Sequence, residues 1–75
     1  MSIQELVVRM NGDVWEVRLG QHLLSTQLTQ KEALGIARIV AEASAVRGVS
    51  TKILVGDPDG NVTEVTFPER PSHVA

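Results

Sequence analysis

The chain contains no cysteine among its 75 residues. Without a thiol, no disulfide can brace the fold and no thiolate zinc site can form. The two histidines, His22 and His73, lie far apart in the sequence and indicate no metal site. A chain of this length buries only a thin core, and small scaffolds usually gain stability from a disulfide, a metal or a partner subunit. The composition therefore favours self-association as the additional source of stability.

Positive charge and aromatic side chains are also scarce. Seven lysines and arginines stand against nine acidic residues, which gives a net charge of −2. This balance is not the electrostatic footprint of a protein that binds phosphates, so nucleic acid is not an expected partner. RNA-binding sheets stack bases on exposed aromatic rings. Apart from the histidines, the aromatic residues are Trp15 and Phe67, and both are expected to point into the core.

Long apolar runs are absent, and no segment approaches the roughly 20 residues that a membrane-spanning helix needs. The first residues lack the basic start and the apolar stretch of a signal peptide. We therefore expect a cytoplasmic protein with no membrane contact. No pattern in the chain indicates a cofactor.

The first half of the chain predicts a β-hairpin. Ile3–Met10 and Val14–Leu19 are strand candidates, and Asn11-Gly12 between them is a strong signal for a two-residue type I′ turn. That turn pairs Met10 with Asp13 and, on the outer face, Glu5 with Arg18 and Arg9 with Val14. The register places one apolar set on a single inner face. Its members are Leu6, Val8, Met10, Trp15, Val17 and Leu19.

A helix is predicted from Gln30 to Arg47. Thr29 and Glu32 have the spacing of a capping box, in which the Thr hydroxyl accepts the Glu32 N–H and the Glu side chain reaches back to the Thr29 N–H. Gly48 supplies the stop. The apolar residues cover about 200° of the helix surface, which is wide for one sheet face. Before the helix, residues 20–22 read as a loop, and Leu23–Gln27 is either part of that connection or a short extra strand.

A second hairpin is predicted after the helix, with strands at residues 51–56 and 62–67. Asp57-Pro58-Asp59-Gly60 has the pattern of a type I turn followed by a bulge, which pairs Ile53 with Val65 and Val55 with Thr63. The fold class is then α+β, a ββαββ domain with the helix packed on one face of a mainly antiparallel sheet. In the predicted sheet, the strands lie side by side in the order 14–19, 3–10, 51–56 and 62–67. A real strand at Leu23–Gln27 would instead favour a mixed sheet. Residues 1–67 form one domain, and residues 68–75 are expected to be a disordered tail.

Several short motifs together resemble a family of short bacterial domains of unknown function. They are Asp13-Val14-Trp15-Glu16-Val17, then Thr29-x-x-Glu32-Ala33 with Ala37 and Ala41, then Val55-Gly56-Asp57 with Gly60 and Glu64. The resemblance covers most of residues 7–66, although the usual hairpin tip is replaced by residues 56–60. It implies the fold and no activity. A weaker resemblance links the hairpin and T-x-x-E-A helix start to the small antitoxin domains of bacterial toxin–antitoxin pairs, whose DNA-binding extension is missing here.

Two chemical interpretations of the sequence are weaker than their structural alternatives. Asp57, Asp59 and Asn61 have the one-three-five spacing of a calcium loop, but an EF-hand needs Gly at loop position six and Glu at position twelve, whereas Gly60 falls at position four and Pro68 at position twelve. A turn that uses Asp, Pro and Gly for their backbone preferences explains the segment better. His22, Ser25 and Thr26 lie near one another without the motif of a catalytic nucleophile. We expect no enzyme activity.

The preferred hypothesis is a protein-interaction or self-association module, either a homo-oligomer or one with a separate protein partner. Ile39 and Val46 lie outside the sheet-facing stripe of the helix, and further aliphatic residues lie among charges on the outer sheet face. Exposed apolar patches rimmed by charge often mark interfaces, although single exposed aliphatic residues are normal. The candidate interface residues are Ile39, Val46, Val7, Val14, Leu54 and Val62. The alternative is an antitoxin-like or nucleic-acid-associated regulatory domain.

Overall fold

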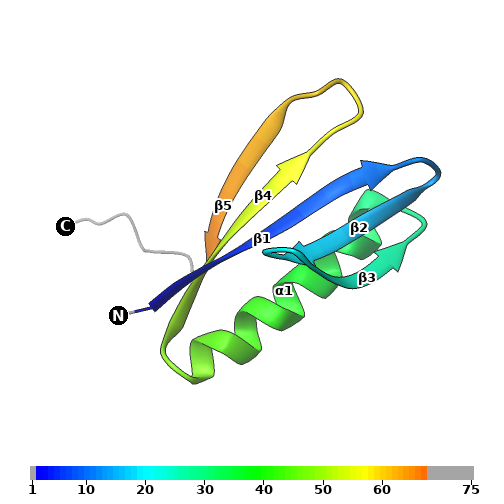
Figure 1. Cartoon of the computed structure of the whole chain (residues 1–75). Coiled ribbons are helices and arrows are strands. Elements are labelled where there is room, and N and C mark those ends of the chain that lie inside the picture. The colour runs from blue at the N-terminus through cyan, green and yellow to red at the C-terminus, as the bar shows by residue number, and fades with distance from the viewer. Residues whose placement is uncertain (1, 68–75) are drawn as a thin grey trace.

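The structure is a computed structural model that describes residues 2–67. Three strands, a helix and two further strands follow one another along this part of the chain (Figure 1). The strands before the helix are β1 (Ser2–Asn11), β2 (Val14–Leu19) and β3 (His22–Gln27). The helix α1 (Gln30–Val46) is followed by β4 (Val49–Gly56) and β5 (Val62–Phe67). The α+β class is confirmed, with β3 added to the predicted ββαββ order. The predicted disordered tail lies outside the described residues.

The strands form one mixed sheet in the order β3-β2-β1-β4-β5. The predicted neighbours of β1 and β4 are confirmed, but the predicted antiparallel pairing of these two strands is wrong, because β1 and β4 run parallel. The other neighbours are antiparallel. The reason is β3, because this extra strand reverses the direction of the chain once more before α1. The helix then returns the chain to the end of the sheet where β1 starts, and β4 runs in the same direction as β1.

The β1–β2 hairpin differs from the predicted register by two residues. Asn11 pairs with Val14 and Met10 with Trp15, so the two-residue loop is Gly12-Asp13. Gly12 has a φ of 66° and Asp13 has a negative φ, which is the pattern of a type II′ turn with Gly in its first central position. A shift of two residues leaves every side chain on its predicted face. Trp15 is accordingly buried, with 5% of its surface exposed, as predicted.

The ends of α1 follow local sequence signals. The Thr29 hydroxyl accepts a hydrogen bond from the Glu32 N–H at 3.1 Å, and the same hydroxyl donates to the Glu32 carboxylate at 3.1 Å. The Glu32 carboxylate thus accepts a hydrogen bond from the Thr29 hydroxyl, whereas the sequence predicted that it would accept one from the Thr29 N–H. Arg47 caps the other end, and Gly48 follows with a φ of 82°.

The β4–β5 hairpin has the predicted register, with Ile53 opposite Val65 and Val55 opposite Thr63. The Gly60 N–H donates to the Asp57 carbonyl at 3.0 Å, which closes the predicted type I turn. One Asp57 carboxylate oxygen accepts the N–H groups of Asp59 and Asn61, each at 3.0 Å. The carboxylate therefore stabilises the turn. In residues 2–67, no three His, Asp or Glu side chains gather as a metal site.

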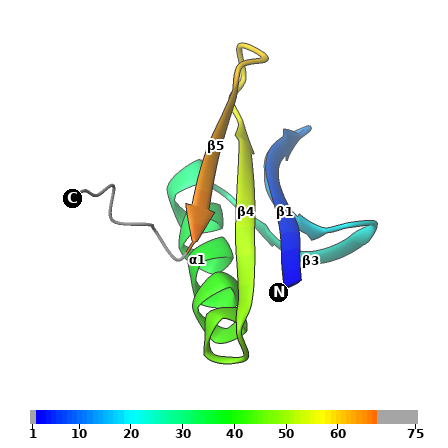
Figure 2. The ribbon, with the colours of Figure 1, turned by 90° about the vertical axis from the view of Figure 1, so that its left-hand side faces the viewer.

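The core lies between α1 and the inner face of the sheet (Figure 2). Ala33, Ala37 and Ala41 are fully buried along the line of α1 that faces the strands. Their small side chains let the helix backbone approach the sheet closely. The sheet contributes the larger buried apolar side chains, which are Leu6, Val8, Trp15, Val17, Ile53 and Val55. Across residues 2–67, no helix has the length and apolar character to cross a membrane.

Candidate interaction site

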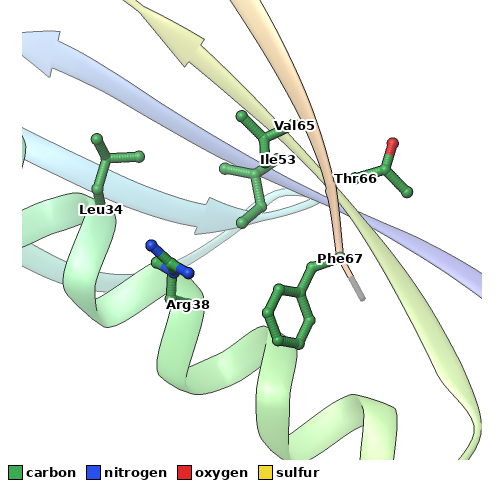
Figure 3. Close-up of a pocket in the computed structure, with 6 residues that line it drawn as sticks. All are labelled: Leu34, Arg38, Ile53, Val65, Thr66 and Phe67. Carbon is green, nitrogen blue, oxygen red and sulfur yellow. The ribbon is translucent and has the colours of Figure 1, made fainter. Parts of the chain in front are cut away.

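An apolar groove opens between α1 and β5 (Figure 3). Its volume is about 280 Å³. It exists because α1 packs mainly against β4, β1 and β2 and makes its fewest contacts with β5, at the edge of the sheet. The inner face of β5 is therefore only partly covered. The lining residues are Leu34, Arg38, Ile53, Val65, Thr66 and Phe67.

The groove has an apolar floor and one partly open wall. Ile53 is buried in the core beneath it. Val65 faces inward from β5 yet keeps 45% of its surface exposed, and Phe67 is partly buried against the core, as its predicted inward direction requires. Leu34 closes the helix side (Figure 3). An apolar side chain of another molecule would bury surface here that water now covers.

Arg38 places a positive charge at the rim of this groove. The ion pairs formed within residues 2–67 are Arg9–Glu16, Arg18–Glu16 and Lys52–Glu64, so Arg38 has no acidic partner in this part of the chain. Glu42, one turn further along α1, does not pair with it. The groove thus combines apolar walls with one cation that is unpaired within residues 2–67.

The groove lies beside an uncovered strand edge. Among the described strands, β5 pairs only with β4, and β3 forms the opposite edge of the sheet. The pairing of β3 with β2 is interrupted by a register shift at Val17/Arg18, and such irregularities blunt an edge against further pairing. The β4–β5 ladder has no such shift. Of the two edges, β5 is therefore the more regular template for another strand.

The predicted interface residues occupy several surfaces and do not form one patch. Ile39 and Val46 lie on the side of α1 away from the sheet, with 62% and 88% of their surfaces exposed. Their predicted position outside the sheet-facing stripe is confirmed. Val7 and Leu54 are neighbours on the outer face of the sheet, where both are partly buried.

The remaining two lie next to the hairpin turns. Val14, beside the first turn, is partly buried, and Val62, beside the second, is 66% exposed. The structure does not bring any of the six predicted residues into the groove. Sequence reasoning missed the groove residues because their exposure depends on how far α1 covers β5.

A charged cluster on the outer sheet face was also missed. Glu16 is only 5% exposed although it faces away from α1. Its carboxylate accepts hydrogen bonds from Asn11 at 3.0 Å, from Arg18 at 3.0 Å and from Arg9 at 3.5 Å. These bonds, led by those from Asn11 and Arg18, lower the pKa of Glu16 below its ordinary value. The predicted register placed Arg9 opposite Val14, whereas the observed register pairs it with Glu16.

A buried polar cluster joins the C-terminal end of α1 to the sheet. The Gln4 side-chain amide donates to the hydroxyls of Ser44 and Thr51, the latter at 3.0 Å. Both hydroxyls are buried. The cluster satisfies polar groups that would otherwise destabilise the core, and its hydrogen-bond partners in the described chain include no base that could activate Ser44 as a nucleophile.

The segment that contains His22, Ser25 and Thr26 is strand β3. The Gln27 side chain donates to the Ser25 hydroxyl at 2.7 Å, and His22 pairs with Leu19 in the sheet. Between residues 2 and 67, no hydrogen bond links His22 to Ser25 or Thr26. These residues therefore form part of the sheet edge, without the contacts of a catalytic dyad.

Comparison of the chain with models of known protein families, with curated proteins and with solved structures finds no match. The resemblances to short bacterial domains and to antitoxin domains therefore stay predictions. Three features of residues 2–67 point to a function: the groove, the unpaired edge of β5 and the charge of Arg38.

Proposed function

We propose that this protein is a non-catalytic protein-interaction module. The observation that carries the proposal is the apolar groove beside the free edge of β5. An uncovered edge offers backbone hydrogen bonds, and an adjoining groove offers apolar contact and selectivity. Together these features support binding of another polypeptide.

The rest of the surface is consistent with this role. Ile39 and Val46 expose a second apolar area on the opposite side of α1, which supports self-association as an additional mode. The hydroxyls of Ser44 and Thr51 accept from Gln4, and the carboxylate of Glu16 accepts from its neighbours. These partners favour structural roles for the polar groups.

Site-specific photo-crosslinking of the full chain in cells tests the proposal. A photoreactive residue replaces Val65 in the groove, Ile39 on the back of α1, or Asp13 in the β1–β2 turn as a control. We expect protein adducts from position 65, position 39 or both, and far fewer from position 13. Sedimentation velocity of the same chain at micromolar concentration detects self-association. A strict monomer that gives no adducts above the control would refute the interaction module.

A further inference from the structure

We infer that the groove binds an extended peptide segment that adds to β5 as a sixth strand, inserts an apolar side chain beside Val65 and Phe67, and pairs a carboxylate with Arg38. This inference rests on the proposed function and names the chemistry of the partner. It joins three observations on one side of the molecule: the open apolar groove (Figure 3), the edge of β5, and the Arg38 side chain, the last two unpaired within residues 2–67.

The backbone of β5 is arranged for strand addition. The Asp57 N–H donates to the Asn61 carbonyl at 2.9 Å. Hydrogen-bonded and non-hydrogen-bonded pairs alternate along an antiparallel ladder. The N–H and C=O groups of Val62, Glu64 and Thr66 therefore point to the free edge. A strand that pairs with them directs alternate side chains to the inner face of the sheet, where the groove lies.

The size of the groove suits one large apolar side chain. An apolar cavity of roughly 150 Å³ is enough to bind benzene, and this groove measures about 280 Å³. An aromatic or branched aliphatic side chain therefore fits, with space for part of its neighbour. Contact with Leu34, Val65 and Phe67 would cover the apolar surface that α1 leaves open.

The charge of the groove selects the polar part of the ligand. Arg38 lines the groove from α1 and is unpaired within residues 2–67. A guanidinium group matches a carboxylate with two parallel hydrogen bonds. Side chains on one face of a strand are two residues apart. A segment with an acidic and an apolar residue at that spacing would therefore satisfy both parts of the groove.

A second copy of this chain fits the groove less well. Antiparallel pairing of two β5 strands would bring two Arg38 side chains to one shared space. The carboxylate that β5 itself carries, Glu64, lies on the outer sheet face, 3.9 Å from the Lys52 ammonium. It would not neutralise Arg38. Charge complementarity thus favours an acidic segment of another protein.

The test measures binding of a synthetic peptide to the full chain by fluorescence anisotropy. The probe is a fluorescein-labelled hexapeptide, Thr-Glu-Thr-Phe-Thr-Val, which places its acidic and apolar residues on one face. We expect saturable binding that weakens about threefold to fivefold in Arg38→Gln. A peptide with Gln in place of Glu should lose the same factor, and combining the two changes should cause no further loss. Replacing the peptide Phe by Ala should weaken binding further, without any effect on the folding of the protein.

Ala43→Glu is the matched control, because it also changes the charge by one unit at an exposed position of α1. It should bind the peptide as the unchanged chain does. Three results would overturn the inference: no binding of the peptide, loss of binding in Ala43→Glu with none in Arg38→Gln, or a β5-mediated dimer that Val65→Lys dissociates. In each case crosslinked adducts at position 39 or 65 would still support an interaction module, so the two proposals fail separately.

Discussion

Replacing Ala37 by Leu tests whether the close approach of α1 to the sheet holds this fold together. Ala37 lies in the middle of the buried alanine line of the helix and has no exposed surface. Because Ala37 is fully buried against the strands, a Leu side chain there should force α1 to move away from the strands or its neighbours to leave their preferred rotamers. Overpacking of this kind costs about 1–3 kcal/mol. The free energy of unfolding of so small a domain is itself only a few kcal/mol.

Urea denaturation followed by Trp15 fluorescence measures this change, because Trp15 is buried in the same core. A loss of about 2 kcal/mol lowers the urea midpoint by roughly 0.7–2 M for the slopes typical of small proteins. It also lowers the melting temperature by about 8–16 °C. Ala43→Leu is the control, because Ala43 is exposed on the same helix and should change stability by less than about 0.5 kcal/mol. Equal stability of Ala37→Leu and the unchanged chain would refute the close-packing argument.

Three further predictions concern single groups. The hydrogen-bonded carboxylate of Glu16 has a folded-state pKa below its ordinary value of 4.5, so its contribution to stability is present above that value and is lost as the pH falls through the lowered pKa. Glu16→Gln should therefore lower the free energy of unfolding at neutral pH and reduce its further decrease at acidic pH. An unchanged decrease at acidic pH would contradict the role of these hydrogen bonds. Thr29→Ala removes the helix cap and should cost about 1 kcal/mol in urea denaturation, whereas Thr29→Ser should keep most of the stability; equal losses would argue against the hydroxyl bond. Trp15 should emit at short wavelength and resist quenching by iodide, and a red-shifted, freely quenched emission would contradict its burial.

The two strands of the second hairpin differ in how deeply their inner-face side chains are buried. Ile53 and Val55 of β4 are buried beneath α1, while Val65 of β5 remains nearly half exposed. A substitution at Val65 should therefore affect binding more than stability, since little packing is lost there. Substitutions at Ile53 should do the reverse. This contrast allows binding and folding to be measured separately on neighbouring strands.

Much of the fold is determined by interactions between residues close in the sequence. The Thr29 cap, the stop at Gly48 and the turn from Asp57 to Gly60 each depend on a few adjacent residues, so the sequence alone predicted α1 and the β4–β5 register. The inner face of the first hairpin was also predictable, because alternation of apolar residues survives a register shift of two. The turn itself was not, since Asn11-Gly12 and Gly12-Asp13 are both acceptable hairpin loops and pairing along the strands decides between them.

Only the tertiary structure decided the features that matter for binding. The segment His22–Gln27 has no clear alternation of its own, and its pairing with β2 makes it a strand. That pairing reverses the chain and sets β1 parallel to β4. The groove then follows from the position of a single helix under a sheet too wide for it to cover. The exposure of Val65 and the position of Arg38 beside it depend on how distant segments pack together, which no local pattern in the sequence encodes.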